Sequence, residues 1–336
     1  MSTATERADA MSLKPCRYVL STPSTTANLG PGFDCLGLAL KQRNRWSVVV
    51  REGEPGRRRV IRQTGGETTE ELPRDENHYF FAAWNMLFRM GFGPDLSAQL
   101  VQAGLEVELE AECATPIARG LGSSAALLVA SCEAYRRLTG VVERAAWELA
   151  SQLEGHPDNA GPAGLGGLFV GTRDEQNRFR ALQPAIHPCW SVVVAVPNFS
   201  LHTAHARAVL PPSLSREDGV FNLGRLPFLL EGLRTGDHDH LTLGCQDRWH
   251  QNQRATLIPG YHQVLEAATG SGASAVFLSG AGPTMAAFVD TRRGASVARG
   301  VSESMVRAFA SAGVGAQGVE LEVDSVGLEV EVGVAH

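Results

Sequence analysis

The sequence contains almost no lysine. Among its 336 residues, lysine stands only at Lys14 and Lys41, and every other strongly basic side chain is an arginine. The common phosphate-binding loop GxxxxGK[ST] requires a lysine directly after its last glycine, so this loop is excluded. Any phosphate site beyond the first strands must therefore use arginine, backbone N–H groups or a metal ion.

Several other features are missing, and each excludes a class of protein. The formal net charge is −6, which does not favour non-specific binding to nucleic acid or to an anionic membrane. No apolar run approaches the ~20 residues of a membrane span, and the polar N-terminus lacks the apolar stretch of a signal peptide. The six cysteines form no CxxC pair, which argues against a zinc site or a disulfide framework. We expect a cytoplasmic protein that binds neither nucleic acid nor membranes.

Short β-rich runs and amphipathic helical runs alternate irregularly along the chain. The expected strands occur in clusters rather than in a strict βαβα order, which favours an α+β fold over a doubly wound sheet. The Arg-, Gly- and Thr-rich stretch 51–74 is typical of a solvated hairpin or loop, and residues 239–251 are expected to form one helix. Polar and proline residues interrupt the pattern near 173–188. We therefore divide the chain into a flexible tail (1–15) and two domains (16–178 and 179–336).

Residues 120–126 read GLGSSAA, and an amphipathic helix is predicted over residues 124–138. Its apolar positions recur at helical spacing, at Ala125, Leu128, Val129, Cys132 and Tyr135. Ser123 or Ser124 is a good N-terminal cap, and Gly120 and Gly122 let a ligand approach the main chain. Free N–H groups and the helix dipole then form an anion site. Taken alone, the motif fits a tight turn with a capped helix equally well.

Two further stretches combine glycine turns with polar side chains. Residues 24–40, STTANLGPGFDCLGLAL, place Asn28 and Asp34 in a glycine-laced turn. This is either an ordinary β-turn or a loop that binds a polar small molecule, with Asp34 available to an ammonium group. Residues 277–289, FLSGAGPTMAAFV, contain a second glycine turn. That turn is either a tight hairpin or a loop pressed against a ligand or against GLGSSAA.

Residues 154–171, EGHPDNAGPAGLGGLFVG, place His156, Asp158 and Asn159 just before another glycine-rich turn. Asp and Asn can serve there simply as turn formers. Glu148 lies eight residues before His156 on the preceding predicted helix. This helix and turn could bring Glu148 and the polar triplet into one pocket.

Together these stretches resemble the GHMP kinases, the superfamily of galactokinase, homoserine kinase and mevalonate kinase. PIARGLGSSAA resembles their ATP-binding motif, and SGAGPT resembles their third motif, a glycine loop in the C-terminal domain. STTANLGPGFDCLGLAL and EGHPDNAGPAGLGG are similar to the homoserine kinases in particular, and the likeness extends over nearly the whole chain. The resemblance implies an α+β GHMP kinase fold, with an N-terminal domain like ribosomal protein S5 domain 2 and a ferredoxin-like C-terminal domain. It also implies ATP-dependent phosphorylation of L-homoserine to O-phospho-L-homoserine, a step of threonine biosynthesis.

The same resemblance assigns roles to individual residues. The ATP phosphates would be wrapped by Pro116, Ile117, Ala118, Arg119, Gly120, Leu121, Gly122, Ser123, Ser124, Ala125 and Ala126. L-homoserine would be bound by Asn28, Asp34, His156, Thr203, Arg207, Arg254, Gly280 and Gly282. Mg²⁺ would be held by Ser124 and Glu148, since hydroxyl and carboxylate oxygens suit this cation. The reaction centre would comprise Asp158, Asn159 and Arg207.

The assignments of Arg207 and Arg254 rest on the resemblance alone. Taken by themselves, both would be interpreted as solvated charges on helices. A planar guanidinium suits the substrate carboxylate, which is the role assigned to Arg254, whereas Arg207 would meet the γ-phosphate. Arg119 stands where small residues are usual in the family, so it would touch either nucleotide or solvent.

The proton of the substrate hydroxyl leaves two mechanisms open. Asp158 is the candidate general base. The superfamily's usual aspartate could instead correspond to Asn159, which cannot take a proton. The reaction would then depend on positioning alone, with the proton leaving through the phosphate.

Two other functions stay open on the sequence alone. The first is another GHMP kinase that acts on mevalonate or a sugar, although such a substrate would not need both Asp34 and Arg254. The second is a catalytically silent nucleotide-binding relative, against which the intact Ser124, Glu148 and Asp158 argue. The sequence does not fix the oligomeric state, and a homodimer is a hypothesis.

Overall fold

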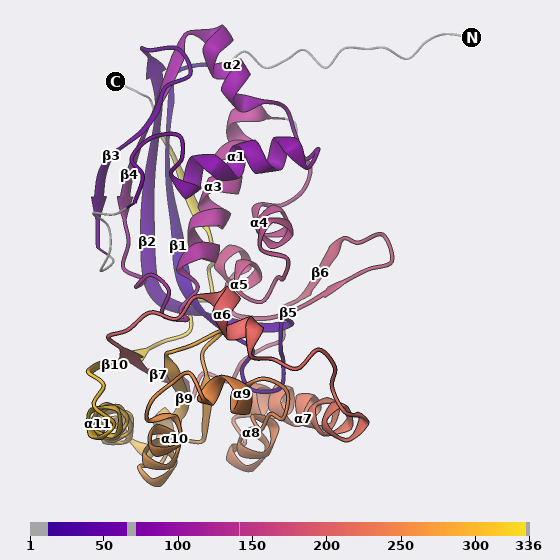
Figure 1. Cartoon of the computed structure of the whole chain (residues 1–336), viewed down its shortest axis with the longest axis vertical. Helices are drawn as coiled ribbons and strands as arrows, with labels where there is room; N and C mark the ends of the chain where they lie inside the picture. The colour runs from indigo at the N-terminus through magenta and orange to yellow at the C-terminus, as the bar shows by residue number, and fades with distance from the viewer. Residues whose placement is uncertain (1–12, 66–71, 141, 334–336) are drawn as a thin grey trace.

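The computed structural model describes residues 13–65, 72–140 and 142–333. These residues form two halves, one above the other in Figure 1, and each half is built on its own β-sheet. The strands are β1 (Cys16–Ala27), β2 (Leu36–Glu52), β3 (Arg58–Thr64), β4 (Leu105–Glu112), β5 (Leu168–Arg173), β6 (Phe179–Leu182), β7 (Trp190–Pro197), β8 (Ala275–Leu278), β9 (Met285–Asp290), β10 (Ala316–Leu321) and β11 (Glu329–Gly333). The helices are α1 (Tyr79–Arg89), α2 (Leu96–Ala103), α3 (Ser123–Thr139), α4 (Ala146–Glu154), α5 (Ala160–Leu165), α6 (Thr203–Ala208), α7 (Arg216–Thr235), α8 (His238–Gly244), α9 (Gln251–Ala255), α10 (Tyr261–Gly270) and α11 (Ala295–Ser311), with a 3-10 turn at Thr291–Arg293.

The first sheet has the strand order β11-β1-β2-β4-β3, and a β5–β6 pair is attached to β2. Its strands pair antiparallel except for β3 and β4, which are parallel. Helices α1, α3 and α4 lie along one face of this sheet (Figure 1). The long strand β2 pairs with β5 near its start and with β4 near its end. It therefore carries the sheet from the outer end of the upper half down to the level of the second half.

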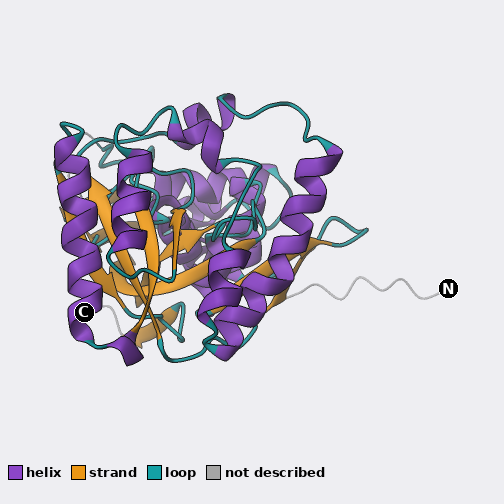
Figure 2. Cartoon of the chain, turned by 90° about the horizontal axis from the view of Figure 1, so that it is seen from below, coloured by secondary structure: helices purple, strands orange, loops and turns teal. Residues whose placement is uncertain are grey.

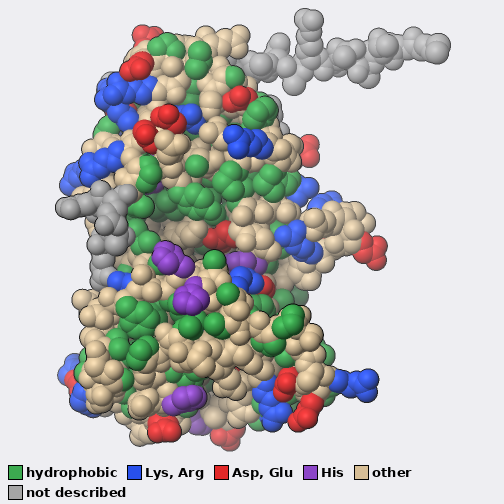
Figure 3. Space-filling model, viewed as in Figure 1, with side chains coloured by type: hydrophobic (Ala, Val, Ile, Leu, Met, Phe, Trp, Pro, Cys, Tyr) green, Lys and Arg blue, Asp and Glu red, His purple; other side chains and the backbone are tan. Residues whose placement is uncertain are grey.

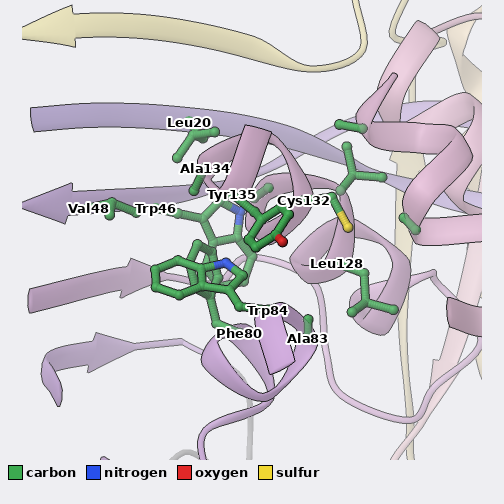
Figure 4. Packing of buried hydrophobic residues seen from close by; sticks show 14 of the residues in the cluster. Leu20, Trp46, Val48, Phe80, Ala83, Trp84, Leu128, Cys132, Ala134 and Tyr135 are labelled. Carbon is green, nitrogen blue, oxygen red and sulfur yellow. The ribbon is translucent and has the colours of Figure 1, made fainter. Parts of the chain in front are cut away.

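Aromatic side chains fill the space between this sheet and its helices (Figure 4). The rings of Trp46 and Phe80 lie 6.1 Å apart and those of Phe80 and Trp84 lie 5.9 Å apart. Buried indoles need a hydrogen-bond acceptor. Trp46 donates to the Thr22 hydroxyl and Trp84 to the Ser131 carbonyl, each at 3.1 Å. The core thus fixes α3 against β1 and β2.

The second sheet is antiparallel, with the order β10-β7-β9-β8. Numbered along the chain, its four strands lie in the order 4-1-3-2, which is the ferredoxin-like arrangement. Side chains alternate between its two faces. One face packs on α10 and α11, and the opposite face packs on α7 and α8 and on leucines of β2. Figure 2 shows these helices around the sheets from below. An apolar layer therefore joins the two halves.

The α+β fold with two sheets is confirmed. The proposed division at 178/179 does not follow the sheets, because β6 and β11 come after it and pair within the first sheet. A two-domain division thus stays a proposal, with the chain returning to the first half at its C-terminal strand. The predicted tail (1–15) falls mostly on residues 1–12, which lie outside the described residues.

Two local predictions are wrong. Part of the stretch 51–74 is not a solvated hairpin or loop, because β3 pairs in parallel with β4 and Arg59 forms an ion pair with Glu108. Residues 239–251 are not one helix, because α8 ends at Gly244 and α9 begins at Gln251. Between them the Asp247 carboxylate accepts backbone N–H groups of the three residues 249–251, each at 2.9 Å. Such a side-chain acceptor offers these N–H groups an alternative to helical carbonyls.

Within the described ranges, none of the helices is both long enough and apolar enough to traverse a bilayer.

Candidate active site

A cavity of about 590 Å³ lies between the two halves, and Figure 3 shows the surface hollowed at this level. This volume is in the range of small-molecule sites. The first turn of α3 lines one part of the cavity. Charged side chains from other elements line another part, among them Asp34, Glu154, Arg207 and Arg254.

The N-terminus of α3 presents bare backbone. Its N-cap is Gly122, which has a left-handed backbone (φ +70°), and no side chain caps the helix. The predicted serine cap is therefore wrong, because Ser123 already lies inside the helix. The first N–H groups of a helix have no acceptor within the helix, so here they remain available to a ligand. A Cβ atom on Gly122 would lie 1.9 Å from the Thr25 hydroxyl, which leaves room only for glycine.

Two segments hold the GLGSSAA loop in place. The Ser279 hydroxyl donates to the Gly120 carbonyl at 2.6 Å, and the Thr284 N–H donates to the Arg119 carbonyl at 3.2 Å. From β1, the Thr25 N–H donates to the Leu121 carbonyl at 3.0 Å. The turn 279–284 is both a tight hairpin, since it joins the antiparallel strands β8 and β9, and a loop in contact with GLGSSAA.

Asn28 and Asp34 lie in a loop that faces Arg207. Both have positive φ angles, +69° and +57°, a conformation that Asn and Asp tolerate better than most residues. The Asn28 side chain donates to the Gly280 carbonyl at 2.9 Å and accepts the Asp34 N–H at 3.0 Å. Arg207 donates two hydrogen bonds to the Asp34 carboxylate, at 2.9 and 2.7 Å. Burial lowers the pKa of Arg207, but the hydrogen bonds and charge of Asp34 outweigh burial and raise it.

His156 and Asp158 form a close pair in the cavity. Nδ1 of His156 lies 2.5 Å from a carboxylate oxygen of Asp158, and both side chains lie within 4.8 Å of Asp34. Burial by itself lowers the pKa of His156. The hydrogen bond and charge of Asp158, together with Glu154 and Asp34, nevertheless raise this pKa to about 9. The imidazole is therefore a cation at neutral pH. Asn159 beside it accepts a hydrogen bond from the Thr25 hydroxyl at 2.9 Å.

The structure brings Glu154, and not Glu148, into the cavity. Glu148 lies in the first turn of α4 and does not line the cavity, whereas Glu154 ends the helix and does. Six residues rotate a side chain by about 240° around a helix, so the two carboxylates face different directions. The placement expected for Glu148 is corrected to Glu154. Burial raises the pKa of Glu154 to about 7, which the charge of His156 and the Ser124 hydroxyl only partly oppose.

Arg254 is buried, with 2% of its surface exposed, so its interpretation as a solvated charge is wrong. Its guanidinium donates to the Ala206 carbonyl at 3.1 Å and to the Gly280 carbonyl at 3.0 Å. It also lies over the Phe33 ring, 5.3 Å from the centroid. Burial and the charge of Arg207 lower the pKa of Arg254 to about 10. It remains a cation at neutral pH.

Most of the residues that the resemblance assigned line this one cavity. They are Asn28, Asp34, Ile117, Ala118, Gly120, Gly122, Ser123, Ser124, Ala125, His156, Asp158, Asn159, Thr203, Arg207, Arg254, Gly280 and Gly282. Pro116, Arg119, Leu121 and Ala126 do not line it, and Arg119 is buried with 7% of its surface exposed.

The chain matches known proteins along most of its length. The profile of the GHMP kinases N terminal domain matches residues 78–167, and that of the GHMP kinases C terminal domain matches residues 229–307. A homoserine kinase of Prochlorococcus marinus (strain MIT 9313) is 38% identical over 313 residues, which cover 93% of this chain and 94% of the relative. A homoserine kinase of Trichormus variabilis is 38% identical over 310 residues, covering 92% and 97%. This chain belongs to the homoserine kinase family of the GHMP kinases.

Solved structures share the fold of this family member. A crystal structure of homoserine kinase from Cytophaga hutchinsonii superposes with a TM-score of 0.78 at 24% identity, covering 97% of this chain and 99% of that one. The mevalonate kinase of L. major, solved with R-mevalonate, superposes with a TM-score of 0.66 at 15% identity, covering 91% and 96%. The fold is thus common to kinases whose substrates differ.

Sequence reasoning missed Glu154, which lines the cavity, and Thr25, which contacts two residues of its lining. Glu154 opens the quoted stretch EGHPDN, and its place two residues before the polar triplet was a usable signal. Thr25, which contacts both Asn159 and the Gly122 position, lies inside the quoted stretch STTANLG but carries no signal of its own. Only the packing of β1 against α3 reveals it.

Proposed function

We propose that this chain transfers the γ-phosphoryl group of ATP to the side-chain hydroxyl of L-homoserine, giving ADP and O-phospho-L-homoserine. The observation that carries this proposal is the composition of the cavity that the α3 N-terminus lines. It combines an uncapped helix N-terminus, which suits phosphate, with both negative carboxylates and positive guanidiniums nearby. An α-amino acid presents an ammonium and a carboxylate together, whereas mevalonate and sugars carry no ammonium.

The backbone would bind the nucleotide phosphates. N–H groups of the first turn of α3 and the positive end of its dipole favour an anion, and the chain has no lysine there. Arg207 would meet the charge that develops on the transferred group. Phosphoryl transfer depends mainly on alignment and charge neutralisation, and both could come from these groups.

Mg²⁺ fits the residues at this end of the cavity. The Ser124 hydroxyl and the Glu154 carboxylate are oxygen ligands of the kind that Mg²⁺ prefers. One oxygen of Glu154, Oε2, is buried and has no hydrogen-bond partner among the described residues. A buried carboxylate oxygen without a partner is costly, and a cation would relieve that cost. We propose Ser124 and Glu154 as the residues that hold Mg²⁺, which would supply charge neutralisation at the phosphate oxygens.

The charged side chains would bind and orient the amino acid. Asp34 would receive the substrate ammonium, and Arg254 would receive its carboxylate. Arg207 donates to the Asp34 carboxylate. A bound ammonium would replace this guanidinium at Asp34, and Arg207 would then be available to the phosphate. Asp158 is the proposed acceptor of the hydroxyl proton. His156, held at 2.5 Å, would fix the direction of its carboxylate.

A coupled ADP-release assay tests the proposal, with purified protein, Mg²⁺-ATP and L-homoserine, run beside mevalonate and galactose. Turnover on homoserine alone is the expected result. Turnover on one of the other alcohols would refute the substrate but keep the kinase. ADP release on none of the three, with ATP binding intact, would refute the catalytic function. The homodimer stays a hypothesis, which light scattering of the same sample would test.

A further inference from the structure

His250 lies at the centre of the contacts that join the two proposed binding groups for the amino acid. Its side chain is completely buried, and it precedes α9 on the segment where the expected single helix is interrupted. One ring nitrogen, Nε2, lies 2.9 Å from the carbonyl oxygen of Gly30, in the loop between Asn28 and Asp34. The other, Nδ1, lies 3.2 Å from Nη1 of Arg254. One imidazole thus contacts both the ammonium-binding loop, which carries Asp34, and Arg254, the proposed partner of the substrate carboxylate.

The chemistry of the two partners fixes the tautomer of this imidazole. A carbonyl oxygen only accepts hydrogen bonds, so Nε2 must carry a proton toward Gly30. A guanidinium only donates, so Nδ1 must accept from Arg254 and cannot carry a proton. His250 is therefore neutral. Burial lowers its pKa and so does the charge of Arg254, although Asp247, the Gly30 carbonyl and Asp34 act in the opposite direction.

The surroundings hold the ring rigidly. Asp247 accepts the backbone N–H of His250 at 2.9 Å and the Asn222 side chain at 2.7 Å. The Phe33 ring, part of the same loop as Asp34, packs against the imidazole at 5.2 Å. A Cβ atom on Gly30 would lie 2.2 Å from the Cys245 carbonyl, so the loop seats tightly on the segment that carries His250.

We propose that His250 is a positioning residue that fixes the distance between the ammonium-binding loop and Arg254, through its neutral Nε2–H tautomer. An imidazole is planar and rigid, so its two hydrogen bonds keep a constant separation. The ammonium and the carboxylate of an α-amino acid sit on one carbon, and a fixed separation of their partners favours this arrangement. The inference rests on the proposed function and deepens it, since it assigns a determinant of α-amino-acid specificity.

Two substitutions separate the two hydrogen bonds. His250→Gln reaches about as far as Nε2 and can still donate to Gly30, but it offers no acceptor to Arg254. His250→Asn reaches about as far as Nδ1 and can still accept from Arg254, but it leaves Gly30 without a donor. His262→Gln, on the exposed side of α10, is the matched control.

Two analogues of homoserine serve as competitive inhibitors in the ADP-release assay. 3-Aminopropan-1-ol keeps the ammonium and lacks the carboxylate, whereas 4-hydroxybutanoate keeps the carboxylate and lacks the ammonium. We expect His250→Gln to raise the inhibition constant of 4-hydroxybutanoate about tenfold, and His250→Asn to raise that of 3-aminopropan-1-ol about tenfold. In each variant the inhibition constant of the other analogue should change less than about twofold. Both variants should raise KM for homoserine, with KM for ATP and kcat within about threefold.

Equal weakening of both analogues by both variants, or an equal rise in KM for ATP, would reduce His250 to a structural role and overturn the inference. Unchanged inhibition constants would overturn it as well. If either variant unfolds, nitrogen NMR of the wild-type chain replaces the kinetics. The nitrogen signals of a neutral Nε2–H imidazole should then shift when homoserine is added. A shift confined to the signals of charged imidazoles would contradict the proposal. Wild-type turnover of homoserine, measured first, tests the proposed function separately.

Discussion

The two ends of the cavity present different chemical groups. At the phosphate end the ligand would meet main-chain N–H groups of a helix capped by a glycine, and the neighbouring side chains are small or absent. At the amino-acid end it would meet charged side chains that already pair with one another, as Arg207 does with Asp34 and His156 with Asp158. The first end should therefore be sensitive to added bulk, and the second to altered charge.

The largest expected effect is at the amino-acid end. Asp158→Asn keeps an acceptor for His156 but cannot take a proton. If Asp158 is the base, kcat should fall by about 10²–10⁴-fold with the fold intact. Steady-state kinetics with homoserine would measure this. A loss below tenfold would contradict the role and favour positioning alone, with the proton leaving through the phosphate.

Added bulk tests the phosphate end. In Gly120→Ala the new Cβ atom would lie 2.4 Å from the Ser279 carbonyl oxygen, at a residue with φ +84°. The loop must shift, and a misplacement of about 1 Å can cost about 10²-fold in rate. We expect such a loss in kcat/KM for ATP.

Gly224→Ala is the matched control for this substitution. Gly224 lies in α7, and a Cβ atom there would meet nothing within 4 Å. Activity should be unchanged, and helix propensity should stabilise the chain by up to about 1 kcal/mol. Full ATP turnover in Gly120→Ala would show that the backbone of this loop does not bind the phosphates.

The metal assignment lies where the two ends meet. Glu154→Gln should raise the Mg²⁺ concentration needed for half-maximal activity about tenfold, because an anionic ligand is lost. Glu148→Gln on the same helix should leave the Mg²⁺ titration unchanged. The reverse pattern would restore Glu148 as the ligand and refute the assignment to Glu154.

The smallest effect concerns two histidines of the same cavity whose pKa values shift in opposite directions. Carboxylates raise the pKa of His156 to about 9, whereas burial lowers that of His78 to about 4. His78 caps α1 through Nδ1, which accepts the Phe80 N–H at 3.3 Å and must be unprotonated to do so. The unfolded chain binds a proton at this histidine below about pH 6.5, and the folded chain only below about pH 4.

The stabilising effect of neutral His78 is therefore present above pH 6.5 and is lost as the pH falls. Between pH 7 and pH 5 the free energy of unfolding should decrease by about 2 kcal/mol from this group. Urea titrations at both pH values would measure the decrease. His78→Asn keeps a cap acceptor but does not titrate, so it should remove this part of the pH dependence. An identical pH dependence in the variant would show that His78 titrates normally.

The sequence predicted the phosphate end more closely than the amino-acid end, for a physical reason. A glycine turn followed by helical periodicity is local, so α3 was expected at Ser124 and begins at Ser123. The choice between Glu148 and Glu154 depends on where α4 ends and which way it faces. The break before α9 depends on Asp247, whose carboxylate takes N–H groups that a continuous helix would use. Burial of Arg254 depends on the packing of α9 against α6 and the glycine loop, which no local pattern records.

The return of β11 to the first sheet has a consequence for synthesis of the chain. The segment Arg17–Ser21 of β1 pairs with β11, whose residues are about 300 positions farther along the chain. While the ribosome makes the intervening residues, the outer side of β1 is an open sheet edge with unpaired N–H and carbonyl groups. Such edges invite pairing with other chains. The nascent chain should therefore be most prone to misassociation late in translation, when its upper half is folded but its final strand is still missing.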